Sequence, residues 1–271
     1  MAKLSWKREM RGAALAGLVL AWLAALPRGA AAAENLLVPG AEFSQLALEK
    51  GVWCRYLVVD EALGQMDSTE VYVGLPAAEV TPRGRAFWLE LLSRPVRGGE
   101  EEAQILKLLV LEGITGFSEG DSLEDYVLKL YIKRGARPVE EKDPSGYDDL
   151  SLIVPTAETS WATSQNVPAA TAAGRFICTQ KTRTVENNQE IPTGKTKLIR
   201  KSRDDYVVWF CGDIPVFRLV KCEIERARET EIVPPIAGVP VGGKKHSRTT
   251  AELTGFGRDA KPILRVDARN R

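Results

Sequence analysis

Runs of alternating polar and apolar residues recur along most of this chain, and residues typical of turns separate them. In Asp125–Lys133 the alternation is nearly unbroken, which places one set of side chains on each face of a strand. Similar runs predict further strands over Trp53–Asp60, Thr69–Gly74, Ala86–Leu92, Arg175–Thr184 and Ala251–Phe256. Ile105–Leu111 also favours a strand, with a short helix as the alternative. Strands that follow one another through turns indicate an antiparallel architecture.

One clear helical period lies in residues 36–50, where Phe43, Leu46 and Ala47 share a face. We expect this short helix to end at Gly51. The predicted fold class is therefore mainly β with one or two helices. A curved antiparallel sheet or half-barrel would pack on a helix.

The distribution of prolines and polar residues suggests how the chain is divided. We expect a single β-rich domain over 34–258 that contains an irregular connection at about 138–170. That connection has room for a short helix or an edge strand near Leu150–Val154. We expect residues 259–271 to form a loosely held C-terminal tail.

The N-terminus has the three parts of a secretory signal peptide. Basic residues precede Ala13–Leu26, a run of apolar or small residues, and Ala30–Ala33 follows a Pro-Arg-Gly break. A permanent anchor is the alternative, but the apolar run is shorter than the roughly 20 residues that span a membrane. We expect residues 1–33 to be removed by a cut near Ala33. The mature protein would be periplasmic or secreted by a bacterium, with no permanent membrane span.

Charge argues against nucleic acid as a partner. Residues 1–33 hold five of the 37 basic residues and one of the 36 acidic residues, so the mature chain carries a net charge of −3. A weakly acidic protein lacks the general attraction to phosphate backbones that basic proteins have. A nucleotide site is also not expected. The GKT at Gly194–Thr196 lacks the first glycine of a phosphate-binding loop, because Gln189 occupies that position.

Four cysteines remain after cleavage: Cys54, Cys178, Cys211 and Cys222. An even number in an exported chain permits disulfides, in any of three connectivities. Cys211 and Cys222 flank a predicted hairpin, and Cys178 on the preceding strand is an equally good partner. Buried free thiols are the alternative. No metal site is predicted, since there is no CxxC pair and a single histidine, His246.

The sequence carries no recognisable catalytic arrangement. His246 lies in a loop without a neighbouring acid, and acidic doublets such as Asp204-Asp205 point to opposite faces if they lie on a strand. We therefore expect a protein that is not an enzyme and uses no cofactor.

Large aromatic residues suggest a second kind of site. In Val208–Lys221, Trp209 and Phe217 stand on either side of a bent connection made by Gly212 and Pro215. They could form the wall of a hydrophobic cavity, but an ordinary hairpin core is the simpler interpretation. The full set of candidate cavity residues is Trp53, Tyr56, Trp88, Trp209 and Phe217.

Four motifs resemble a group of uncharacterised bacterial exported proteins. They are Gly51-x-Trp53-x-x-Tyr56, Phe87–Glu90, Val167–Cys178 and the Val208–Lys221 block. In that group a glycine usually stands at the turn where this chain has Phe217-Arg218, and Cys211 is unusual. The group is more loosely similar to the periplasmic lipoprotein carriers (LolA and LolB). That resemblance implies a half-barrel closed by helices over an apolar cavity, with a lipid- or acyl-binding role and no catalytic residues.

The sequence leaves three functional hypotheses open. The first is a non-enzymatic periplasmic protein that binds or carries an acyl chain, a lipid or a lipoprotein. The second is a structural or protein-interaction component of the cell envelope. The third is an envelope hydrolase of unknown type.

Overall fold

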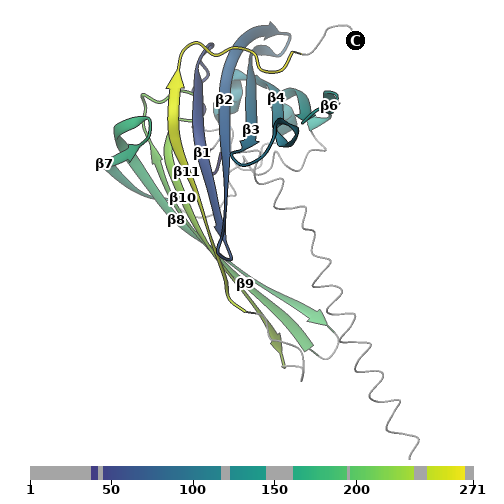
Figure 1. The fold of residues 1–271 in the computed structure, drawn as a ribbon, viewed down its shortest axis with the longest axis vertical. Helices are drawn as coiled ribbons and strands as arrows, with labels where there is room; N and C mark the ends of the chain where they lie inside the picture. The colour runs from purple at the N-terminus through teal and green to yellow at the C-terminus, as the bar shows by residue number, and fades with distance from the viewer. Residues whose placement is uncertain are drawn as a thin grey trace, which may run out of the picture.

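The computed structural model describes residues 38–41, 45–116, 123–144, 161–193, 196–234 and 243–265. The predicted signal peptide, its cleavage point and the segment Leu150–Val154 lie outside these ranges. Within them the chain forms one open, curved antiparallel sheet of eleven strands (Figure 1). The sheet order is β6-β5-β4-β3-β2-β1-β11-β10-β9-β8-β7, so two consecutive meanders meet where β1 pairs with β11.

The strands have the following bounds: β1 Trp53–Ala62, β2 Gln65–Thr81, β3 Gly84–Pro95, β4 Gln104–Leu111, β5 Val127–Arg134, β6 Glu140–Lys142, β7 Ala162–Thr171, β8 Gly174–Thr193, β9 Thr196–Phe210, β10 Leu219–Val233 and β11 Lys245–Gly257. Among the described residues, three short 3-10 helices have complete bounds: η3 Glu100–Glu102, η4 Glu112–Gly116 and η5 Leu123–Asp125. The prediction of a mainly β, antiparallel fold is confirmed.

The predicted packing of the sheet on a helix is wrong, because no α-helix occurs among the described residues. In the part of 36–50 that the structure covers, Ala47 instead forms an isolated antiparallel bridge with Val216. The backbone N–H of Ala47 donates to the carbonyl of Val216 at 2.5 Å, so this donor serves a distant segment rather than a helical turn.

Two boundary predictions also differ from the structure. Residues 162–170 of the expected irregular connection belong to strand β7, and 140–142 form β6. The described part of the tail, which was expected to be loose, is held by specific contacts as far as Leu264, whose side chain is buried. Pro168 fits in β7 because this strand lies at one edge of the sheet, where a missing N–H is tolerated.

Strand register defines two faces of the sheet, because residues directly opposite one another point to the same side. On β1, the inner face carries Tyr56, and the outer face carries Trp53 and Leu57. One inner row runs across four strands through Val58, Ala251, Cys222 and Val208. All four of these side chains are buried, so the inner face holds the main core.

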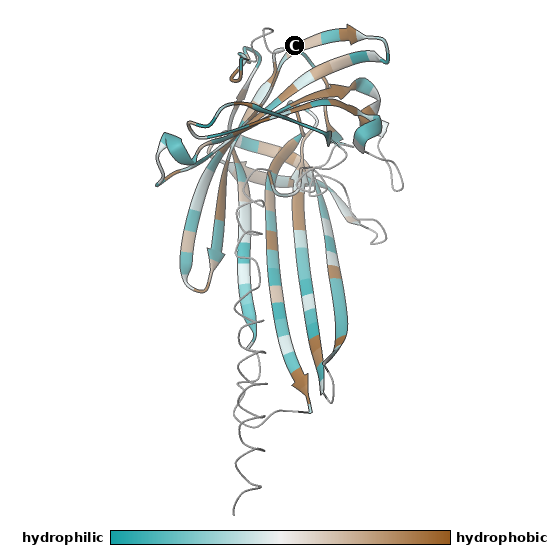
Figure 2. Cartoon of the chain, turned by 90° about the vertical axis from the view of Figure 1, so that its right-hand side faces the viewer, coloured by the Kyte–Doolittle hydropathy of each residue, from teal (hydrophilic) through white to brown (hydrophobic). Residues whose placement is uncertain are grey.

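Strands β8, β9 and β10 continue beyond the ends of β1 and β11 as a projecting arm (Figure 1). We define the arm as residues 186–193 of β8, 196–203 of β9 and 228–233 of β10. The arm is mainly polar, in contrast to the body of the sheet (Figure 2). Cross-strand ion pairs such as Lys197–Glu190, at 3.0 Å, cover it, but exposed pairs of this kind stabilise weakly.

Candidate ligand-binding face

The inner face of β1–β5 is a continuous apolar surface. Strand alternation brings large side chains from neighbouring strands to this side, and each of the following is buried: Tyr56, Val71, Val73, Phe87, Leu89, Leu91, Leu106, Leu108 and Val110. A single sheet with such a face needs a second layer to exclude water from it. Within the described part of the chain, that layer is built from irregular segments.

The principal cover is the connection between β9 and β10, residues 211–218, which we call the cover loop. Ile214, Val216 and Phe217 of this loop are buried in the main core cluster. The loop is fastened to β1 by the Cys54 thiol, which donates to the carbonyl of Pro215 at 3.1 Å. The N-terminal residues Leu46 and Val52 are buried beside it.

Tyr56 anchors the end of the cover loop. Its side chain is fully buried, and its hydroxyl donates to the carbonyl of Leu219 at 3.2 Å. Burial raises the pKa of Tyr56 well above its usual value, and the neighbouring Cys54 thiol raises it further. The phenol therefore remains neutral and acts as a hydrogen-bond donor rather than as a base.

The cover loop contains unfavourable backbone conformations. Val216 has φ +61° and Arg218 has φ +55°, both in the left-handed region that costs L-residues about 1–2 kcal/mol. A β-branched residue is especially rare there. The backbone N–H of Cys211 donates to the carbonyl of Arg218 at 2.8 Å and closes the loop. Strained segments of this kind concentrate at functional positions, which makes the cover loop a candidate moving part.

The five predicted cavity residues do not share one surface. Tyr56 and Phe217 both belong to the main core cluster, where they are essentially without solvent contact. Trp53, Trp88 and Trp209 stand on the outer face, on β1, β3 and β9. All three tryptophans are only partly buried.

Each outer tryptophan has its own local partner. Trp53 stacks on Tyr72 with ring centroids 5.9 Å apart. Trp88 lies under the ammonium group of Lys107 at 4.8 Å, and Trp209 lies 5.7 Å from that of Lys221. The ring–cation pairs stabilise the outer surface of the sheet and do not line a common cavity.

All four cysteines are free and buried, so the disulfides that the sequence permits are not formed. Desolvation raises the pKa of Cys54 and of Cys222 to about 12 and that of Cys178 to about 11. Thiols with such values remain protonated near neutral pH and react slowly. Among the described residues no group of three or more histidine, cysteine or acidic side chains is placed to hold a metal ion.

The C-terminal residues 259–265 cross the outer face as a strap. The indole N–H of Trp53 donates to Asp259 at 2.7 Å, and the backbone N–H of Ile263 donates to Glu90 at 2.5 Å. Lys107 donates to the carbonyl of Leu264 at 2.8 Å and forms an ion pair with Glu90 at 2.8 Å. The strap thus buries a charged pair whose carboxylate has no solvent exposure.

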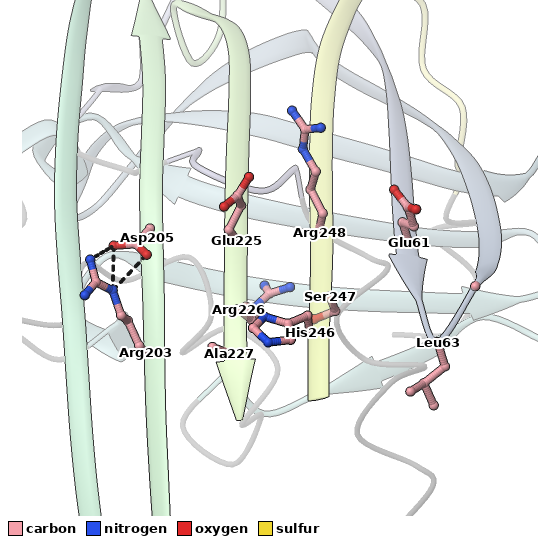
Figure 3. Close-up of a pocket in the computed structure, with 11 residues that line it drawn as sticks. Glu61, Leu63, Arg203, Asp205, Glu225, Arg226, Ala227, His246, Ser247 and Arg248 are labelled. Carbon is pink, nitrogen blue, oxygen red and sulfur yellow. Dashed lines mark hydrogen bonds and ion pairs between the residues drawn. The ribbon is translucent and has the colours of Figure 1, made fainter. Parts of the chain in front are cut away.

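An open groove of about 500 Å³ lies on the outer face next to the arm (Figure 3). The opposed residues Asp205, Glu225, Arg248 and Glu61 form a row across β9, β10, β11 and β1. This row was not predicted from the sequence, because adjacency across four strands is set by register rather than by sequence spacing. Local pattern alone carries no signal for it.

The groove is lined by charged side chains, and several of them already form ion pairs. Arg203 bonds Asp205 at 2.9 Å, and Arg248 bonds Glu223 at 2.9 Å. His246, on β11, also lines the groove, but its imidazole forms no hydrogen bond or ion pair with any described residue. It therefore has no acid that orients it as a general base would require.

No protein-family model and no curated protein matches the chain. Three solved structures align with it over most of its length. The first is a "putative lipoprotein" from Parabacteroides distasonis, with 10% identity over 80% of this chain and 99% of that one and a TM-score of 0.32. The second is a "putative exported protein with YmcC-like fold" from Bacteroides fragilis, with 9% identity, the same coverages and a TM-score of 0.28.

The third structure is the MucA/MucB complex of Pseudomonas aeruginosa. It shares 9% identity over 85% of this chain and 99% of that one, with a TM-score of 0.20. All three TM-scores are below 0.5, so we infer nothing about this chain from these likenesses. In the described part of the chain, no helix is both long and apolar enough to cross a membrane.

Proposed function

We propose that this chain is an exported, non-enzymatic protein that binds a hydrophobic ligand, an acyl chain or a lipid, on the inner face of its sheet. The ligand enters where the cover loop meets β1. The leader-like composition of residues 1–33 supports export.

The cover of the apolar face is the observation that carries this proposal. Among the described residues, an inner surface that spans most of the strands is closed by irregular segments, and neither a second sheet nor an α-helix covers it. The cover loop combines buried apolar side chains with two strained residues, Val216 and Arg218. The strain at these two residues lowers the cost of opening the cover loop relative to an unstrained loop with the same contacts, which suits the entry of a hydrophobic ligand.

A protein-interaction role is the second candidate, and the edge of the arm favours it. Strand β7 pairs with β8 only as far as Thr182, so residues 183–193 of β8 have a free edge among the described residues. An extended peptide could add to that edge as a further strand.

Lipid analysis of the exported protein tests the proposed function. The full chain is produced with its own leader in a bacterial host, purified from the periplasm and extracted for mass spectrometry. We expect a bound lipid or fatty acid in near-stoichiometric amount and a mature N-terminus at Glu34. A properly exported sample without any lipid would refute the ligand-binding proposal.

Two alanine variants make a matched comparison. Phe217→Ala removes a buried ring of the cover loop, and Trp209→Ala removes a ring of the outer face. We expect the first variant to retain less lipid than the second. Equal retention in both would place the ligand elsewhere, and co-purification of a protein instead of a lipid would favour the interaction role.

A further inference from the structure

Arg183 stands at the border between the apolar and polar parts of the inner face. It lies on β8 opposite Tyr206, and the same row continues through Ile224 and Thr249 to Asp60. The preceding row on the body side contains the buried residues Val208, Cys222 and Ala251. The following row, toward the arm, contains Asp204 and Arg226.

Two aromatic rings hold the guanidinium group of Arg183. Its central carbon lies 4.4 Å from the ring centroid of Trp161 and 4.6 Å from that of Tyr206. Both rings pack against the main core cluster. A guanidinium group between two rings has a fixed plane, and its nitrogen-bearing edge is the part left to form hydrogen bonds.

Arg183 differs from the arginines around it because no described residue provides an acceptor for its guanidinium group. Its Nε atom is buried and lacks a hydrogen-bond partner, and no ion pair joins it to any described residue. Arg226 donates to Thr249 at 2.7 Å, and Arg228 bonds both carboxylate oxygens of Asp204. The Arg183 side chain is only partly buried, so the rest of the guanidinium group reaches solvent.

The carboxylates nearest to this position already have partners. Asp204 is bound by Arg228, and Asp60 accepts a hydrogen bond from Thr249 at 2.5 Å. The positive charge of Arg183 also acts on the buried Cys222. Burial raises the pKa of this thiol, and the charges of Arg226 and Arg183 lower it by a smaller amount. An orphaned, pre-oriented cation beside an apolar surface has the features of a site for an oxyanion.

We propose that Arg183 binds the anionic head group, a carboxylate or a phosphate, of an amphiphile whose chain lies on the inner apolar face. This inference rests on the proposed function and specifies its ligand class as fatty acids or anionic lipids. Trp161 and Tyr206 act as positioning residues that hold the guanidinium plane. The neighbouring Arg226 adds positive charge on the same face.

Equilibrium dialysis with three radiolabelled ligands of one chain length tests the site: dodecanoate, dodecyl phosphate and dodecan-1-ol. The proteins are the mature wild type, Arg183→Gln, Arg183→Lys and the control Arg55→Gln. Arg55 is matched because it also lies over a ring, that of Trp53, but on the outer face.

We expect Arg183→Gln to weaken binding of the anionic ligands by about tenfold, as the loss of a charge-assisted contact predicts, and that of dodecan-1-ol by less than about twofold. Arg183→Lys should fall between the wild type and Arg183→Gln, because it keeps the charge without the planar fork. Arg55→Gln should match the wild type. The tighter of the two anionic ligands identifies the head group.

Three outcomes would overturn the inference. Equal losses for charged and neutral ligands would make Arg183 a packing residue only, and unchanged dodecanoate and dodecyl phosphate binding would place the head group elsewhere. In both of these cases the proposed function survives. If the wild type binds none of the three ligands, the proposed function fails together with the inference. Melting temperatures of all variants identify misfolding, and Arg183→Lys serves as the test if Arg183→Gln does not fold.

Discussion

The buried pair Glu90–Lys107 offers a sharp test of how the C-terminal strap is held. Glu90 has a fully buried side chain, and Lys107 is 12% exposed. The lysine also donates to Leu264 and lies over the ring of Trp88, while the carboxylate accepts from the backbone of Ile263. Each partner of the pair is therefore tied to the strap as well as to the other.

The expected losses follow from what each substitution leaves behind. Lys107→Met leaves a buried carboxylate with one donor, and breaking a buried pair in this way costs about 3–5 kcal/mol. Glu90→Gln keeps an acceptor for Ile263 and leaves a partly exposed ammonium, so we expect a loss of about 2 kcal/mol. The double variant should lose about 2 kcal/mol less than the sum, since neither charge is then left alone.

Urea unfolding at pH 7 and 25 °C measures these free energies, and hydrogen exchange at the Ile263 amide reports on the strap. The control is Glu70→Gln, which breaks an exposed outer-face pair with Arg94 whose nitrogen and oxygen atoms are 2.9 Å apart. We expect the control to lose less than about 1 kcal/mol. A Lys107→Met loss no larger than the control's, or unchanged exchange at Ile263, would refute the reasoning.

Four further predictions concern the cover loop and the thiols. Arg218→Gly should stabilise the protein by roughly 0.5–1 kcal/mol in urea unfolding, because glycine adopts positive φ without strain and its larger unfolded-state entropy offsets only part of the gain; destabilisation would contradict the strain. Tyr56→Phe should cost about 1–2 kcal/mol, because a buried carbonyl loses its donor; a neutral result would show that water replaces the hydroxyl. Ellman's reagent should find four thiols in denaturant and almost none in the native protein. Burial raises the pKa of Cys54 and of Cys222 from the ordinary 9.0 to about 12 in the folded protein, so these thiols lose their protons at lower pH in the unfolded chain. The free energy of unfolding should therefore fall as the pH rises above about 9. A flat stability profile from about pH 8.5 to 10 would exclude this linkage.

The strands were largely predictable because the alternation of polar and apolar residues along a strand reflects which side chains face water. Asp125–Lys133 corresponds to β5 within two residues at either end. The prediction was poorer where neither face is buried. The arm of β8 and β9 has no buried face, and β8 extends to Thr193, well beyond the predicted end at Thr184. Composition suggested a loop at Pro168, although an edge strand tolerates proline.

The contacts that the sequence could not predict join residues that lie far apart in the chain. The N–H of Ala47 and the indole of Trp53 bind groups far along the chain, and no periodicity records either contact. The same limit applies to the candidate site. The sequence singled out the aromatic residues together, but strand parity places Trp53 on the outer face and Tyr56 on the inner face. Arg183 has no sequence signature at all, since its two rings come from β9 and from the residue before β7.

The pairing of β1 with β11 has a consequence for how the chain reaches its fold. Every other strand neighbour in the sheet is also a neighbour in sequence, so both meanders can assemble from local hairpins. The β1–β11 seam joins segments about 180 residues apart, and closing a loop of that length costs several kcal/mol in entropy, of order (3/2)RT ln n. We expect the two halves to form early and the seam to form late. Until the seam forms, β1 in one half and β11 in the other each expose one unpaired edge. A chain that has not completed folding would need protection along these edges.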